Sequence, residues 1–208
     1  MNGELLRFEL ESSHTLLLDR CNRQWGLCGF PFDIYELHDL AHPGFPGEQY
    51  KLLIFLNCAR ISSEAAEGIR RWQNADRVFC WTYAPGVTGP DGLHPSKNAE
   101  LIGMRLGWRN QRQNIYVNIE NAGHALTQGA ASLNFGTEGS VGPVFFADDP
   151  EATVLGTLRD GGEAAFAVRQ HDHWRSVYLA MHNFDSHLLR NLLARPAAAR
   201  RRSPSAIW

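Results

Sequence analysis

Residues 50–57 read YKLLIFLN, and this stretch decides the fold. Its centre is a run of large apolar residues from Leu52 to Leu56 without a single charge. A continuous apolar run of this length is typical of a central parallel strand that is covered on both faces. The polar Asn57 ends the run, so the sequence predicts a buried strand whose carboxyl end lies at that residue.

A helix and a second buried strand follow this first strand. Ser62 and Ser63 can cap a helix that carries Glu64 in its first turn, where a negative charge is favourable. The second strand is RVFCWTY, residues 77–83. Strand, helix and strand in this order form a βαβ unit, which implies parallel strands and a right-handed crossover. The sequence therefore predicts a parallel sheet.

The second half of the chain is rich in short predicted strands. A loop, APGVTGPDG at residues 84–92, separates the two halves. Period-two alternation and turn residues predict strands at residues 114–119, 143–146, 153–158, 164–168 and 176–180, and helices at 4–25, 98–104 and 186–193. We expect an α/β domain over residues 1–195: a flavodoxin-like, three-layer parallel sheet with helices on both faces and a β-rich C-terminal half. Residues 196–208 form a low-complexity tail that we expect to be disordered.

Composition limits the function classes. The 208 residues suit one domain, and a net charge of -2 gives no electrostatic argument for nucleic acid or an anionic membrane as a partner. No stretch approaches the roughly 18 apolar residues that span a bilayer. The four cysteines form no CxxC pair, a usage that fits reduced thiols in a cytoplasmic protein.

Four phrases carry a resemblance to a known family. They are PFDIYELHDL (31–40), YKLLIFLNCARISSEAAEGIR (50–70), VFCWTYAPGVTGPDG (78–92) and SVYLAMHNFDSHLLRNLLAR (176–195). Together they resemble the trimerisation-type domain of family forty-two β-galactosidase-like proteins, which belongs to the class I glutamine-amidotransferase-like superfamily. In that family the domain follows a catalytic TIM barrel, packs between subunits and does no chemistry. The resemblance also implies an acidic strand before the first helix and a strand after the last one. Neither is visible, so we expect a sheet truncated at both ends with an exposed edge.

The resemblance places a nucleophile on a sharp turn directly after a central strand, between small residues. The corresponding turn is YAPG, residues 83–86, which offers neither cysteine nor serine. Pro85 also removes a backbone N–H that an oxyanion would need. Cys58, directly after the first strand, is the weak candidate for a catalytic nucleophile, and it requires a histidine base within hydrogen-bond reach.

A ligand site is expected at the carboxyl ends of the two strands, because ligands of open α/β sheets bind there. Trp81 and Tyr83 point the same way along their strand, so both can line a cleft and stack on a sugar. The expected ligand-binding residues are Asn57, Trp81, Tyr83, Pro85 and Gly86. The histidines of HDHW, residues 171–174, lack the spacing of an established zinc site, and we expect neither a metal nor a cofactor.

Three functions follow from these observations. The first is a non-catalytic assembly domain that forms a homo-oligomer or packs on a TIM-barrel glycoside-hydrolase domain. The second is a carbohydrate-binding module that uses Trp81 and Tyr83 to hold a saccharide. The third is a hydrolase or amidotransferase-like enzyme with an unconventional site at Cys58. The empty turn and the resemblance favour the assembly domain.

Overall fold

A mixed β-sheet forms the centre of the computed structural model, which describes residues 24–73, 76–129, 135–181 and 185–194. Within these residues the main sheet has nine strands in the order β1-β2-β11-β10-β9-β6-β7, with β8 pairing β10 and β5 pairing β8. The strands are β1 (Leu52–Phe55), β2 (Arg77–Thr82), β5 (Leu106–Arg109), β6 (Gln113–Ile119), β7 (Phe135–Val141), β8 (Val144–Ala147), β9 (Thr153–Leu158), β10 (Ala164–Gln170) and β11 (Trp174–Leu179). A separate small hairpin joins β3 (Thr88–Gly89) to β4 (Gly92–Leu93).

The helices are short. They comprise two 3₁₀ turns, η1 (Leu37–Ala41) and η2 (Gly47–Gln49), and three α-helices, α2 (Ser63–Trp72), α3 (Ala99–Ile102) and α4 (Ser186–Ala194). Residues 24–28 are also helical, while the rest of the predicted helix 4–25 and the tail 196–208 lie outside the described residues.

The predicted βαβ unit is confirmed. β1 pairs in parallel with β2, and β2 pairs in parallel with β11. Between β1 and β2 the chain forms α2, and the Ser62 hydroxyl accepts a hydrogen bond from the backbone N–H of Ala65 at 3.2 Å. This is the N-cap that the sequence predicts, and it satisfies one of the free donors of the first helical turn.

The predicted parallel sheet is found only in part of the structure. From β11 outward the strands pair antiparallel: β11 with β10, β10 with β9, β9 with β6 and β6 with β7. The connections explain this difference. Residues 159–163 join β9 to β10, and residues 171–173 join β10 to β11, whereas a parallel crossover needs a dozen or more residues. The α/β class and the β-rich second half hold, but the flavodoxin-like arrangement is not confirmed.

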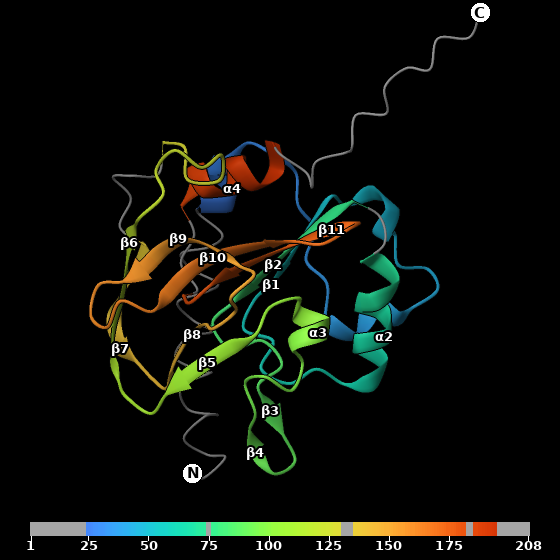
Figure 1. Ribbon diagram of the computed structural model, residues 1–208. Coiled ribbons are helices and arrows are strands. Elements are labelled where there is room, and N and C mark those ends of the chain that lie inside the picture. The colour runs from blue at the N-terminus through green and yellow to red at the C-terminus, as the bar shows by residue number, and fades with distance from the viewer. Residues whose placement is uncertain (1–23, 74–75, 130–134, 182–184, 195–208) are drawn as a thin grey trace, which may run out of the picture.

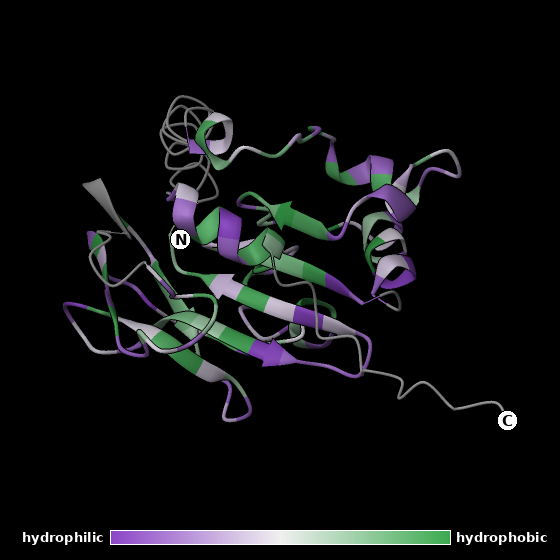
Figure 2. Cartoon of the chain, turned by 90° about the horizontal axis from the view of Figure 1, so that it is seen from above, coloured by the Kyte–Doolittle hydropathy of each residue, from purple (hydrophilic) through white to green (hydrophobic). Residues whose placement is uncertain are grey.

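Helices lie on both sides of the sheet. Figure 1 shows α4 on one face and α3 on the other, with α2 beside α3. The Gln73 side-chain amide donates to the Leu101 carbonyl at 2.6 Å and so joins α2 to α3. Apolar residues run along the strands in the middle of the molecule in Figure 2, and every residue of β2 is buried, as expected for a strand packed between layers. The largest fully buried side chains include Trp81, Tyr178, Phe79, Phe145 and Phe166.

An exposed segment precedes η1. Residues 27–35, which we call the apolar strap, begin in the last two residues of the 24–28 helix, have no strand partner among the described residues and lead into the η1 turn. In Figure 1 the strap belongs to the blue chain that descends from the level of α4 to η1. From residue 31 to residue 36 the chain forms neither a helix nor a strand.

Candidate functional site

The carboxyl ends of β1 and β2 meet at one edge of the sheet, because the two strands are parallel neighbours. Asn57 and Tyr83 follow these strands, and both adopt the left-handed backbone conformation, with φ of 48° and 57°. This conformation is uncommon for residues other than glycine. The Asn57 N–H donates to the Thr82 hydroxyl at 3.0 Å and ties the two turns together. The sequence therefore predicted correctly that these residues share one edge.

The turn at Tyr83 is closed by hydrogen bonds. Its hydroxyl donates to the Pro143 carbonyl at 2.8 Å, and its own carbonyl accepts from the Tyr178 hydroxyl at 2.7 Å. Its N–H donates to the Leu179 carbonyl at 2.8 Å. The Tyr83 ring packs edge-on against Phe145, and only 6% of the residue is exposed. The side chain at this turn is thus a buried tether between β2 and the 142–143 turn.

The loop after Tyr83 is joined to the loop after β1. The Gly86 N–H donates to the Cys58 carbonyl, and the Thr88 N–H donates to the Ala59 carbonyl, both at 2.8 Å. The Asn98 side-chain amide donates to the Gly86 carbonyl at 2.6 Å. Gly86 has a φ of +62°, and a Cβ atom there would lie 2.7 Å from the Asn98 Nδ2 atom. Pro85 and Gly86 are both buried. The expected cleft is therefore occupied by the protein's own loops.

Trp81 lies in the core rather than on a surface. It is completely buried, and its ring stacks on Phe55 with the ring centroids 4.0 Å apart. A saccharide would have to displace Phe55 or another core residue to stack on this indole. The structure thus gathers the expected ligand-binding residues at one edge, with Trp81 and Tyr83 directed into the protein and Asn57 half-buried.

The Cys58 thiol has the raised pKa that is expected of a buried, unreactive cysteine. Burial raises the pKa of its thiol to about 12. Its Sγ atom lies 3.7 Å from the Leu56 carbonyl oxygen. A nucleophilic cysteine needs the opposite shift, because the thiolate is the reactive species. At neutral pH the Cys58 thiol stays protonated.

The histidine segment serves to hold α3 on the sheet. The His171 ring stacks on Trp174 with centroids 4.1 Å apart, and its Nε2 atom lies 2.9 Å from the Gly103 carbonyl oxygen. Burial is the main cause that lowers the pKa of His171. Within the described part of the chain, no group of three or more His, Cys, Asp or Glu residues is placed to hold a metal ion.

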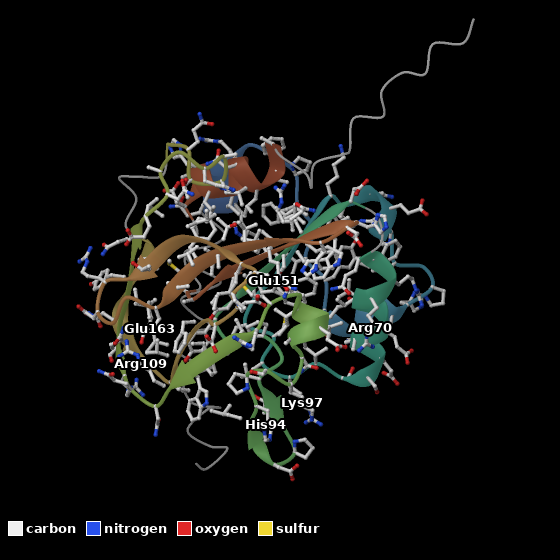
Figure 3. All side chains as sticks on the ribbon, in the orientation of Figure 1. Arg70, His94, Lys97, Arg109, Glu151 and Glu163 are labelled. Atoms are coloured by element: carbon white, nitrogen blue, oxygen red, sulfur yellow. The ribbon has the colours of Figure 1, made fainter. Side chains whose placement is uncertain are left out.

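One ion pair away from this edge is largely buried. Arg109 on β5 contacts Glu163, just before β10, with 3.1 Å between Nε and Oε1 (Figure 3). Both side chains are about three-quarters buried. This pair, with the hydrogen bond from the Arg109 guanidinium to the Asp160 carbonyl at 2.8 Å, joins β5 to the turn between β9 and β10.

Comparison with known proteins gives the fold. No protein-family model matches the sequence, and no curated protein matches it either. A cytoplasmic protein of Salmonella typhimurium superimposes with a TM-score of 0.57 at 14% identity, over 86% of this chain and 84% of that one. A ThuA-like protein of Bacteroides uniformis gives 0.52 at 15% identity, over 89% and 83% of the two chains.

A β-galactosidase has the same fold in one of its parts. The cold-adapted enzyme of Rahnella sp. R3 superimposes with a TM-score of 0.51 at 19% identity. The match covers 70% of this chain but only 22% of the β-galactosidase. At these identities the likeness establishes a common fold. The described residues also contain no helix that is long and apolar enough to cross a membrane.

The sequence interpretation missed the apolar strap as a surface. Large hydrophobic residues with a high exposed fraction gather there: Leu27, Phe30, Phe32, Ile34 and Tyr35. The only other such residues in the described ranges are Trp108 and Val154. The signal was present as five large apolar residues within nine positions, interrupted by Gly29 and Pro31.

Proposed function

We propose that this chain is a non-catalytic, amidotransferase-like assembly domain associated with a β-galactosidase or another glycoside-hydrolase-like protein. The observation that carries the proposal is the closed turn at Tyr83. Where this fold would present a nucleophile, the chain has a buried tyrosine whose hydroxyl, carbonyl and N–H are all used in internal hydrogen bonds.

The chemistry of acyl transfer supports the same conclusion. Such a reaction needs an activated nucleophile, a base and donors aimed at the oxyanion. At this edge the N–H groups of Tyr83 and Gly86 already donate to backbone carbonyls. The thiol of Cys58 is held in its protonated form by burial. Residues 57–59 and 83–88 are therefore better suited to packing than to turnover.

The association with a glycoside hydrolase is supported by the fold shared with part of the Rahnella β-galactosidase. On this proposal the domain comprises residues 1–195 and works in the cytoplasm, and its partner is a second copy of the chain or a TIM-barrel glycoside-hydrolase domain. The parallel pairing of β1, β2 and β11 supports an α/β assembly domain of this kind.

A mass measurement combined with a turnover screen tests the proposal. We expect light scattering to give a multiple of 23.3 kDa, and no hydrolysis of glutamine, nitrophenyl esters or nitrophenyl β-galactosides above the buffer rate. Cys58→Ala is the decisive variant, and Cys28→Ala is its matched control, because Cys28 is a buried thiol far along the chain from the edge. A monomer whose turnover disappears in Cys58→Ala but persists in Cys28→Ala would overturn the proposal.

A further inference from the structure

The apolar strap exposes far more apolar surface than any other described segment. Its exposed fractions are 53% for Leu27, 45% for Phe30, 46% for Phe32, 68% for Ile34 and 42% for Tyr35. Together the five residues expose the equivalent of about two and a half complete side chains, or roughly 500 Å² at about 200 Å² for each large side chain. Patches of this size on a soluble protein often mark an interaction site.

The strap passes around one end of the sheet. Near its start, the Arg190 guanidinium of α4 donates to the Leu27 carbonyl at 2.6 Å. Near its end, the hydroxyl oxygens of Tyr35 and Tyr50 are hydrogen-bonded at 2.8 Å, just before β1 begins. The strap therefore crosses from the α4 face toward the face that carries α2. The strand that it passes is β1, the terminal strand of the sheet order among the described residues.

The strap is held in a defined position although its side chains are exposed. Phe32 packs edge-on against Trp25 with ring centroids 5.0 Å apart, and Tyr35 does the same against Phe45 at 5.0 Å. Its one charged residue, Asp33, accepts a hydrogen bond from the Tyr50 hydroxyl at 2.5 Å. A partner would thus meet a prearranged apolar surface, which lowers the entropic cost of binding.

The character of the strap favours a protein partner over a sugar. Sugar platforms combine an exposed ring with polar groups that hold the hydroxyls, whereas Leu27 and Ile34 are aliphatic, and Phe30 and Phe32 carry no polar atom. Aromatic and aliphatic residues with few charges are typical of the centre of a protein interface. Its roughly 500 Å² supplies more than half of the about 800 Å² that each partner contributes to a standard interface.

We propose that the apolar strap binds the apolar strap of a second copy of this chain, across a two-fold axis beside β1. A two-fold interface uses the same surface of both copies. The apolar strap and the neighbouring terminal strand β1 supply one such surface on each copy, which favours self-association. The net charge of -2 adds little repulsion between two copies. The inference rests on the proposed assembly function and names the surface that performs it.

The test measures the mass of the complete chain over a concentration series by analytical ultracentrifugation. Ile34→Glu is the main variant: 68% of Ile34 is exposed in one copy, so we expect its replacement to leave the fold intact. Each dimer would then bury two carboxylates, so we expect the dimer dissociation constant to rise on the order of 100-fold. Val154→Glu is the matched control: Val154 is exposed to 40%, but it lies on β9 and outside the strap.

Cysteine cross-linking gives an independent readout. Ile34→Cys should form a covalent dimer with a short bismaleimide, and Val154→Cys should not. An oligomer whose mass is unchanged in Ile34→Glu would overturn this inference and leave the assembly function standing. A chain that is monomeric at every concentration would also overturn this inference, and the assembly function would then require a TIM-barrel glycoside-hydrolase domain as its partner. Loss of the oligomer in Ile34→Glu alone, with unchanged circular dichroism, supports the inference.

Discussion

Replacing Tyr83 with phenylalanine removes one oxygen atom from the turn that carries the functional argument. The Tyr83→Phe variant keeps the ring and its edge-on contact with Phe145. It loses the hydrogen bond from the hydroxyl to the Pro143 carbonyl. If the turn is a structural tether, the variant should lower stability and leave every binding or catalytic readout unchanged.

The size of the effect follows from the burial of the bond. A typical intramolecular hydrogen bond contributes about 1 kcal/mol, and a buried acceptor left without its donor costs about 1–3 kcal/mol. Tyr83 is 6% exposed, and Pro143 is buried. We therefore expect the free energy of unfolding to fall by about 1–2 kcal/mol. For a domain of this size, that corresponds to a fall in melting temperature of about 3–6 °C.

Urea unfolding followed by tryptophan fluorescence measures this change, and Tyr35→Phe is its matched control. The Tyr35 hydroxyl also hydrogen-bonds to another group, Tyr50, but the residue is 42% exposed in a single copy, so water can replace the lost partner when the titration is made on the monomer. We expect the control to lose less than about 0.5 kcal/mol. Equal losses in the two variants would refute the tether, as would a Tyr83→Phe protein of unchanged stability that has lost affinity for a saccharide.

Three further variants test the site and the fold. Burial raises the pKa of Cys58 to about 12 from the ordinary 9.0. Above pH 9 the unfolded chain therefore loses a proton that the folded chain keeps, so the free energy of unfolding falls as the pH rises. Cys58→Ala should reduce that slope by about 1.4 kcal/mol per pH unit in urea titrations between pH 9 and 11. An unchanged slope would mean that folding does not raise the pKa of the Cys58 thiol. A Cβ at Gly68 would lie 2.6 Å from the Leu40 carbonyl carbon of η1, so Gly68→Ala should destabilise the protein by about 1–2 kcal/mol in calorimetry, whereas an exposed helical site would gain stability. Ser62→Ala removes the cap on Ala65 and should cost about 1 kcal/mol by the same measurement, with Ser62→Asp restoring it.

The local elements were predictable from the sequence. The strand at 52–55, the cap at Ser62 and the buried run at 77–82 each depend on residues close together in the chain, and the structure has all three elements. The expected central place of the first strand was wrong: β1 is the terminal strand of the described sheet order, and three of its four residues are only half-buried. The meeting of Asn57 and Tyr83 at one edge also followed, since parallel neighbours end on the same side. The prediction that Trp81 lines an open cleft was wrong. Alternation tells which side of a strand a ring lies on but not what covers that side.

The sequence predicted where the candidate site lies but not the contacts that its residues make. The sequence showed that the turn at residues 83–86 lacks a thiol or a serine. It could not show that the Tyr83 hydroxyl reaches Pro143, because these residues are far apart in the chain and the contact depends on how β8 is placed. For the same reason the pKa of Cys58 could not be foreseen. Its rise comes from burial by surrounding loops.

By itself, the sequence determined that this chain forms an α/β domain with a βαβ unit and no nucleophile at the turn after β2. Those features depend on hydrophobic period, capping and residue identity, which act over a few positions. Only the tertiary structure decided that the sheet is mixed, that the turn at Tyr83 is closed and that the strap at residues 27–35 is exposed. Strand pairing and exposure depend on which distant segments pack together, and no local pattern records that packing.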